Sequence, residues 1–266
     1  MNLKITVPDI ISRKQDGRKI TMLTAYDYTF ARLIDEAGID IILVGDSLGT
    51  VVQGHPTTLP VTMDEMIYHT KIVSRAVENA LVVGDMPFMS YQISVSDAVY
   101  NAGRFLKEGA AAAVKVEGGS AVIEKTRAII ASGIPVMGHV GLLPQSVHQM
   151  GGYKVQGKED SSAEKILSES LLLEDAGVFA VVLECIPASL ATKITNTLSI
   201  PTIGIGAGVH CSGQVLVIHD LLGLTPQPVP RFVRQYAAMR GICTDAVRRF
   251  KEDVETGKFP SDDESY

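Results

Sequence analysis

Four carboxylates are the residues of this chain best suited to carry chemistry, because each directly follows a short apolar stretch. They are Asp46, Asp85, Glu117 and Glu184, and His139 follows a further stretch of the same kind. Carboxylates brought close together repel one another, so such a group is costly unless a cation neutralises it. Oxygen ligands without cysteine or a histidine pair favour Mg²⁺ over zinc. Each acid taken singly could also be a loop residue or a helix N-cap.

A lysine and a serine lie close to these acids in the sequence. Lys115 stands two residues before Glu117, so on a strand both side chains project from the same face. A lysine buried there is costly alone, and we interpret it as a cation that meets a substrate carboxylate or enolate oxygen beside the metal. The alternative is a surface lysine at the end of a helix. The Ser47 hydroxyl, with the backbone amides around Gly49, could hold the same anion.

The apolar pattern predicts the elements that must position these residues. The run Ile41–Val44, closed by Gly45, is typical of a strand buried on both faces, as in a parallel sheet covered by helices. Strands are predicted at Ile20–Ala25, Ile39–Val44, Leu81–Gly84, Ala112–Val116, Pro135–Gly138, Phe179–Leu183, Pro201–Gly206 and Gln214–Ile218. Helices are predicted at Asp27–Ala37, Met63–Asn79, Ser94–Glu108, Ser120–Ser132, Ser161–Asp175, Pro187–Leu198, Val229–Arg240 and Cys243–Glu255. Gly38 and Gly177 stand where helix C-caps are expected.

This alternation of strands and helices, without a break in composition, favours an α/β protein made of one (β/α)8 TIM barrel domain over residues 1–266. An extra N-terminal helix at Thr6–Arg13 precedes the first strand and would close the bottom of the barrel. Barrel enzymes place their chemistry at the carboxyl ends of the strands, so the acids would share one mouth. A doubly wound open sheet is the alternative, because strand order is not visible in one sequence.

Composition excludes several classes of protein. The formal net charge is -6, and lysines and arginines are interspersed among acids, which argues against a nucleic-acid or anionic-membrane surface. No apolar run approaches the roughly 20 residues that span a bilayer, and the N-terminus lacks the apolar core of a secretion signal. We therefore expect a cytoplasmic protein. Cys185, Cys211 and Cys243 indicate neither a disulfide framework nor a zinc cluster, and we interpret them as buried small residues.

Two glycine-rich segments remain. The segment Gly138–Ser161 has no clear periodicity, and a loop of this length in a compact domain is usually a lid or a binding loop, so we expect it to cover the mouth. GIGAG at Gly204–Gly208 lies where barrels often bind phosphate. Its spacing does not satisfy the dinucleotide-binding pattern, and a tight turn after a strand is the favoured interpretation.

The chain closely resembles the ketopantoate hydroxymethyltransferase family in six motifs that occur in order, GDSLGTVVQGHPTTLPVT, GDMPFMSY, VKVEGG, GHVGLLPQSVHQMGGYKVQG, VLECIP and GIGAG. The resemblance covers nearly the whole chain. It implies a Mg²⁺-dependent (β/α)8 barrel that transfers the one-carbon unit of 5,10-methylenetetrahydrofolate to 3-methyl-2-oxobutanoate. The product would be 2-dehydropantoate, for pantothenate and coenzyme A synthesis. A homodecamer is also implied.

The resemblance further implies roles for single residues. The family's metal ligands correspond to Asp46, Asp85 and Glu117, its keto-acid contacts to Asp46, Ser47, Asp85 and Lys115, and its proton acceptor to Glu184. Leu143, where the family has a threonine, and the neighbourhood of Pro226–Pro230 depart from the pattern, and both lie outside the metal site.

Two other functions remain open at this point. A related Mg²⁺ barrel enzyme that cleaves or rearranges carbon-carbon or carbon-phosphorus bonds would use similar acids, although the chain lacks the KKCGH-type cysteine loop of the lyases. A non-catalytic binding barrel would keep the fold without a competent base, and Glu184 and Lys115 argue against it. In the favoured mechanism, Glu184 takes the C3 proton of the keto acid, while Lys115 and the metal stabilise the resulting charge.

Overall fold

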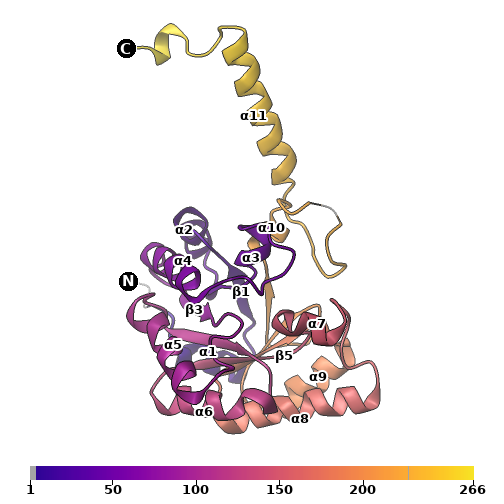
Figure 1. The fold of residues 1–266 in the computed structure, drawn as a ribbon. Coiled ribbons are helices and arrows are strands. Elements are labelled where there is room, and N and C mark those ends of the chain that lie inside the picture. Colours follow the sequence, from indigo (N-terminus) through magenta and orange to yellow (C-terminus); the bar gives the residue numbers. More distant parts are fainter. Residues whose placement is uncertain (1–3, 227) are drawn as a thin grey trace. The chain divides into compact units, whose positions relative to one another are not determined.

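The computed structural model describes residues 4–226 and 228–266, and within them parallel strands close into an eight-stranded barrel (Figure 1). The strands are β1 (Ile20–Thr24), β2 (Ile41–Val44), β3 (Leu81–Asp85), β4 (Ala113–Glu117), β5 (Val136–Gly141), β6 (Ala180–Glu184), β7 (Thr202–Ile205) and β8 (Gly213–Leu216). Each pairs in parallel with its neighbour in the sequence, and β1 pairs with β8. The predicted (β/α)8 barrel is confirmed, and the open sheet is excluded.

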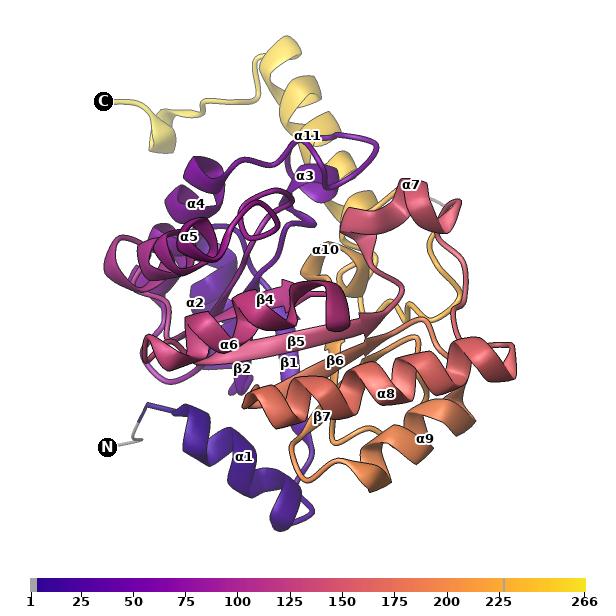
Figure 2. The ribbon, with the colours of Figure 1, turned by 60° about the horizontal axis from the view of Figure 1, so that its bottom comes forward.

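Helices surround the barrel on its outer side (Figure 2). The longer ones are α2 (Tyr28–Glu36), α4 (Met63–Ala76), α5 (Val95–Lys107), α6 (Ile123–Ala131), α8 (Asp160–Ala176) and α9 (Ala188–Thr197). Short helical turns lie in the loops, at α3 (Leu48–Val51), η1 (Ser120–Val122), η2 (Pro144–Ser146) and α7 (Val147–Met150). Gly38 and Gly177 follow α2 and α8 with φ of 80° and 94°, a left-handed conformation that glycine adopts without strain. The predicted glycine caps are therefore present at these two ends.

The interior of the barrel is apolar at the end where the strands begin. Every second residue of the strands contributes to one buried cluster, which contains Ile20, Met22, Ile41, Leu43, Leu81, Val83, Ala113, Met137, Ala180, Val182, Ile203 and Val215. Helix α1 (Val7–Gln15) supplies Ile10, which is fully buried in the same cluster. As predicted, the N-terminal helix closes this end of the barrel.

Polar residues continue the same alternation at the other end of the strands. Asp85 lies two residues after Val83, Lys115 and Glu117 follow Ala113, and Glu184 follows Val182 at the same spacing. Because side chains of a strand alternate between its two faces, these polar groups point into the barrel above the apolar layers. The strands thereby deliver the predicted acids to one mouth.

Close packing outside β3 depends on a glycine. A Cβ atom on Gly84 would stand 2.2 Å from Cδ1 of Phe105, which is fully buried on α5. The missing side chain lets the Phe105 ring press directly on the strand next to Asp85. The position of this carboxylate is therefore fixed by packing from outside the barrel.

The chain forms two compact units, one up to Val217 and the other Ile218–Tyr266. The second unit contains α10 (Ile218–Leu221), α11 (Met239–Glu255) and the short turn η3 (Asp262–Glu264). The helix predicted at Val229–Arg240 is wrong, because helical structure there begins only at Met239. Prolines in the preceding segment lack the N–H that a helix interior needs. A single domain over residues 1–266 stays a prediction.

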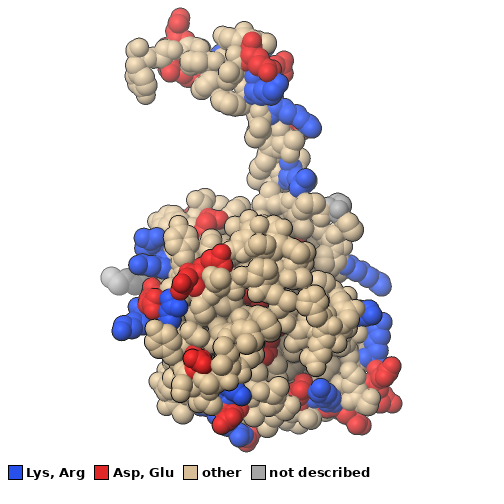
Figure 3. Space-filling view, viewed as in Figure 1, with Lys and Arg blue, Asp and Glu red and all other residues tan. Residues whose placement is uncertain are grey.

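The surface carries charges of both signs. Figure 3 shows lysine and arginine interspersed with aspartate and glutamate on the face displayed, without a continuous basic stripe. No helix in the described part of the chain has both the length and the apolar character needed to cross a membrane.

Candidate active site

Asp46 and Asp85 form the first pair of acids at the mouth. Asp46 follows β2, and its backbone N–H donates to Oδ2 of Asp85, at 3.1 Å. Both carboxylates are buried. Burial, and then repulsion from Asp85 and Glu117, raise the pKa of Asp46 well above its usual value. Burial also raises the pKa of Asp85, although Lys115 opposes this. These two acids therefore favour a positively charged partner.

Lys115 is the ammonium group inside this cluster. Its Nζ lies 2.7 Å from Oδ1 of Asp85 and 3.7 Å from Oε1 of Glu117. Burial alone would lower the pKa of Lys115, but the surrounding carboxylates outweigh burial and raise it. The lysine is thus held in its charged form inside the barrel. The alternative, a surface lysine at a helix end, is wrong, because Lys115 lies on β4 and is buried.

Glu117 and Glu184 are joined by His139. On β5, His139 is paired in register with Glu117 of β4, and its Nδ1 lies 3.5 Å from Oε1 of Glu117. Its Nε2 lies 3.2 Å from Oε2 of Glu184. Burial and Lys115 would lower the pKa of His139, but the bonds to the two glutamates outweigh them and raise it to about 9. Lys115 and His139 in turn lower the pKa of Glu117 against the effect of burial.

Glu184 is the acid of this cluster that retains contact with solvent. Its side chain is 16% exposed, whereas that of His139 beside it is 2% exposed. The next residue, Cys185, has φ of 48°, a left-handed conformation that is uncommon outside glycine and is found at functional sites. This sharp turn ends β6 immediately after Glu184, which leaves the carboxylate at the rim of the mouth.

Gln145 and Tyr91 connect the acids to the loops; Tyr91 is a lining or lid candidate from its motif GDMPFMSY, whereas Gln145 was missed by sequence reasoning. The side-chain Nε2 of Gln145 donates to Oδ2 of Asp46, at 3.0 Å, and to the carbonyl of Met86, at 2.9 Å. Its backbone N–H donates to Oε2 of Glu117, at 3.1 Å. The Tyr91 hydroxyl donates to Oε1 of Gln145, at 2.9 Å, and accepts the N–H of Glu117, at 3.0 Å.

Ser47 lies at the edge of the cluster. Its hydroxyl is 2.7 Å from the hydroxyl of Tyr26, a residue that sequence reasoning missed. Ser47 directly precedes α3, where the chain turns away from Asp46. The structure therefore places all the predicted site residues at the same end of the barrel, with His139, Gln145, Tyr91 and Tyr26 added to them.

The donor set suits a hard divalent cation. The Oδ1 of Asp85 and Oε1 of Glu117 are buried and face the Lys115 ammonium, at 2.7 and 3.7 Å, so a cation already lies beside both oxygens. In the described part of the chain, no group of three or more histidine, cysteine, aspartate or glutamate side chains is arranged so that it could hold a metal ion as it stands. The buried acids nevertheless supply the oxygen ligands that Mg²⁺ prefers, and water and substrate commonly complete the coordination of this ion.

A cavity of about 500 Å³ opens beside the acids. Its lining includes one of the four acids, Glu117, together with Tyr91, Gln145 and residues of η2 and α7. The loop Gly138–Ser161, predicted to cover the mouth, thus borders a cavity next to the acids. Its motion stays a prediction. GIGAG forms the turn after β7, where Gly206 and Gly208 have positive φ.

Comparisons of the sequence with known proteins all point to one family. The model of the family described as ketopantoate hydroxymethyltransferase matches residues 4–262. The 3-methyl-2-oxobutanoate hydroxymethyltransferases of Pelobacter propionicus and Geobacter sulfurreducens are each 57% identical over 266 residues, which cover 100% of this chain and 98% and 100% of theirs.

Solved structures are similar in fold at much lower identity. A phosphonopyruvate hydrolase in complex with oxalate and Mg²⁺ has a TM-score of 0.62 at 13% identity, covering 98% of this chain and 93% of its own. A 2,3-dimethylmalate lyase of the PEP mutase/isocitrate lyase superfamily has a TM-score of 0.61 at 14% identity, covering 98% and 89%. At these identities the likeness concerns the fold alone.

Proposed function

Since this chain belongs to the ketopantoate hydroxymethyltransferase family, we propose that it uses Mg²⁺ to transfer the one-carbon unit of 5,10-methylenetetrahydrofolate to 3-methyl-2-oxobutanoate. Family membership makes the chain an enzyme, a transferase that delivers a hydroxymethyl group to this keto acid in pantothenate biosynthesis. The metal and the folate donor are the proposed parts. The observation that carries them is the group of buried acids around Lys115 and His139 at one end of the barrel.

Asp46, Asp85 and Glu117 would hold the magnesium ion. Their oxygens are of the hard type that Mg²⁺ prefers. When bound, Mg²⁺ polarises a keto oxygen and offsets the negative charge that develops when C3 loses its proton. Asp46, Ser47, Asp85 and Lys115 would contact the keto acid, and the Lys115 ammonium would add to the stabilisation of that charge.

Glu184 would accept the proton from C3. It stands at the rim of the mouth with part of its carboxylate open to solvent, so a substrate can reach it. The Nε2 of His139 lies 3.2 Å from one oxygen of this carboxylate, which leaves the other oxygen for the substrate. The carbanion formed at C3 would then attack the methylene carbon of the folate iminium, whose C=N electrons move to nitrogen. Water would displace that nitrogen to release tetrahydrofolate and leave a hydroxyl group on the product. The cavity of about 500 Å³ beside Glu117 would admit this second substrate.

Hydrogen exchange at C3 tests the proton transfer separately from the complete reaction. We expect proton NMR in deuterated water to show loss of the C3 signal of 3-methyl-2-oxobutanoate with protein and Mg²⁺, and 2-dehydropantoate once methylenetetrahydrofolate is added. Glu184→Gln should reduce exchange by about 10²-fold or more, while the exposed Glu164→Gln on α8 should match the unmodified protein. Unchanged exchange in Glu184→Gln would remove Glu184 from this role.

Two further parts of the proposal have simple tests. Product formation without folate, or from a phosphonate substrate, would contradict the assignment of methylenetetrahydrofolate as donor. The homodecamer, which rests on family resemblance, predicts a mass close to ten times that of the 28.5 kDa chain in light scattering. A cytoplasmic location stays a prediction.

A further inference from the structure

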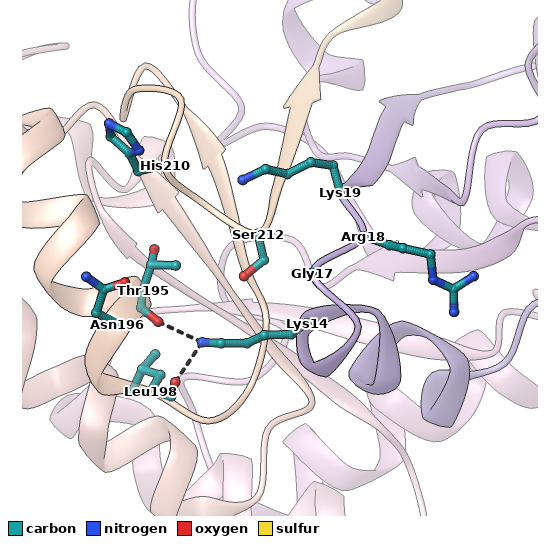
Figure 4. A pocket seen from close by; sticks show the side chains of 9 residues that line it. All are labelled: Lys14, Gly17, Arg18, Lys19, Thr195, Asn196, Leu198, His210 and Ser212. Atoms are coloured by element: carbon teal, nitrogen blue, oxygen red, sulfur yellow. Dashed lines mark hydrogen bonds between the residues drawn. The ribbon is translucent and has the colours of Figure 1, made fainter.

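A second cavity, of about 330 Å³, lies away from the carboxylate mouth (Figure 4). Its lining comes from the turn between α1 and β1, the last turn of α9 and the residues before β8. These are the amino ends of β1 and β8, which pair in register from Ile20 and Gly213. Since the proposed chemistry lies at the carboxyl ends of the strands, this cavity is at the opposite end of the barrel.

The lining of this cavity, drawn in Figure 4, is basic. It includes Lys14, Arg18 and Lys19, and none of the described residues that form it is acidic. Glu174 acts on Lys14 from outside the lining, and its carboxylate is already bonded to the N–H groups of residues 199 and 200. The described residues that line the cavity therefore carry positive charge and no carboxylate, while Asp16 and Glu174 act on Arg18 and Lys14 from outside the lining.

The cations differ in what they can still bind. The Nζ of Lys14 donates to three carbonyls, those of Thr195, Leu198 and Ile200, at 2.6 to 2.9 Å. This lysine joins α1 to the end of α9. All three of its N–H groups are already used, so it can offer a ligand positive charge but no hydrogen bond. Arg18 points to the other side in Figure 4, and its Nη2 is paired with Asp16 at 2.7 Å.

Lys19 and its neighbours keep donors for a ligand. One N–H of Lys19 donates to the carbonyl of Cys211, at 2.6 Å, which leaves two. The Ser212 hydroxyl accepts the N–H of Thr202, at 3.2 Å, and so keeps its own hydrogen to donate. In Figure 4 both groups face the space between α1 and α9, with the exposed His210 imidazole at its rim.

We propose that this cavity binds a small metabolite through a phosphate group. Lys19, Ser212 and His210 belong to two separate segments, residues 17–19 and 210–212, and together offer several N–H and O–H donors, which suits a group with several acceptor oxygens. A planar carboxylate is recognised best by the two parallel N–H groups of an arginine, and Arg18 is turned away. The lysines provide point charges of the kind that bind phosphate.

The remaining lining restricts the ligand further. Apart from the imidazole of His210, no ring lines the cavity among the described residues, so a nucleotide base would have nothing larger on which to stack. The volume is at the small end of the range for sites that hold small molecules. A short phosphorylated acid or sugar therefore fits better than a nucleotide cofactor. Because the two ends of the barrel are separate, this ligand would bind without competing with substrate.

Calorimetric titration of the full chain tests this site. The probes are inorganic phosphate, glycerol 3-phosphate and acetate, at constant ionic strength and with a chelator, so that no divalent ion draws anions to the acidic mouth. We expect saturable binding of one phosphate or glycerol 3-phosphate per chain, and at least ten-fold weaker binding of acetate. Lys19→Gln should weaken phosphate binding about ten-fold or more, because a charge-assisted hydrogen bond is lost.

Three variants separate a binding role from a folding role. His210→Gln changes an exposed side chain and should weaken phosphate binding severalfold with an unchanged circular dichroism spectrum. Ser212→Ala should do the same through the loss of its donor. Lys71→Gln, an exposed lysine on α4 outside the cavity, should bind phosphate as the unmodified chain does. The proposal is overturned if phosphate shows no saturable binding, if acetate binds equally well, or if Lys19→Gln and His210→Gln both keep full affinity.

Discussion

Replacing Gln145 with leucine should both destabilise the protein and shift the pH dependence of metal binding. Gln145 is buried, and its side chain links Asp46, the carbonyl of Met86 and the Tyr91 hydroxyl. Leucine has a similar volume, so the cavity left behind is small. The loss of stability then comes from lost hydrogen bonds rather than from packing. Its magnitude can be estimated from the groups that lose a partner.

The magnitude follows from the groups left without a partner. The Oδ2 of Asp46 and the carbonyl of Met86 each lose a donor in a buried site, at a cost of about 1 to 3 kcal/mol each. The backbone N–H of residue 145 still reaches Glu117, so that contact is kept. We expect Gln145→Leu to lower the free energy of unfolding by about 2 to 6 kcal/mol.

The second effect acts on ionisation. The bond from Gln145 opposes the burial and repulsion that raise the pKa of Asp46, so its loss should raise that pKa further. Metal binding requires the deprotonated carboxylate, and the pH at which the variant takes up Mn²⁺ or Mg²⁺ should therefore move upward. The sign follows because the bond from Gln145 lowers the pKa of Asp46, so removing this donor disfavours the ionised carboxylate.

Urea unfolding and Mn²⁺ binding followed by electron paramagnetic resonance across pH measure these two effects. Gln149→Leu is the matched control, because Gln149 lies four residues further along the same loop, is exposed and makes no side-chain hydrogen bond in the described structure. If Gln145→Leu keeps both the unfolding free energy and the pH of metal uptake of the control, Gln145 does not hold Asp46 in the way argued.

Three other predictions concern different parts of the chain. Lys115→Met removes the ammonium that neutralises the buried acids, and in metal-free urea unfolding it should cost about 3 to 5 kcal/mol, part of which added Mg²⁺ should restore. Asp35 accepts N–H groups of residues 78–80, bonds that outweigh burial and lower its pKa below 3.8. The stabilisation of the folded state by ionised Asp35 is therefore present above pH 3.8, and it is lost as the pH falls through the lowered pKa. Asp35→Asn should cost about 2 kcal/mol at pH 7, with the difference from the unmodified protein shrinking in acid unfolding experiments. Burial, and then the adjacent carboxylate, raise the pKa of the Cys185 thiol to about 12, so mass spectrometry after iodoacetamide treatment at pH 8 should find the exposed Cys243 modified and Cys185 unmodified.

Much of the fold and of the acid cluster could be predicted from the sequence because both depend on local patterns. Buried parallel strands are continuous apolar runs, and a polar residue at the end of such a run marks the mouth of a barrel. The two-residue spacing of Lys115 and Glu117 is enough to place both inside. What each acid binds does not follow from these local patterns.

The connections between these residues could not be predicted in the same way. Gln145 stands 99 residues from Asp46 and 54 from Tyr91, in a loop without periodicity, so no local signal assigns its bonds. His139 was visible as a strand-end residue, but its position between Glu117 and Glu184 follows from the register of β4, β5 and β6. The helix predicted at Val229–Arg240 is wrong for a different reason. The apolar pattern there favours a helix, but the prolines around the start of the segment oppose one.

The charges inside the barrel give the strongest physical argument for a divalent ion at the mouth. Four carboxylates surround one ammonium, that of Lys115, and one imidazole, that of His139, whose Nδ1 lies 3.4 Å from the ammonium nitrogen. Even with both of these groups charged, two negative charges remain without a partner when all four acids are ionised. The raised pKa of Asp46 indicates that protonation of this carboxylate is the protein's own way to relieve the excess. A divalent cation would cancel it fully and displace that proton, so occupancy of the site and ionisation of Asp46 are coupled.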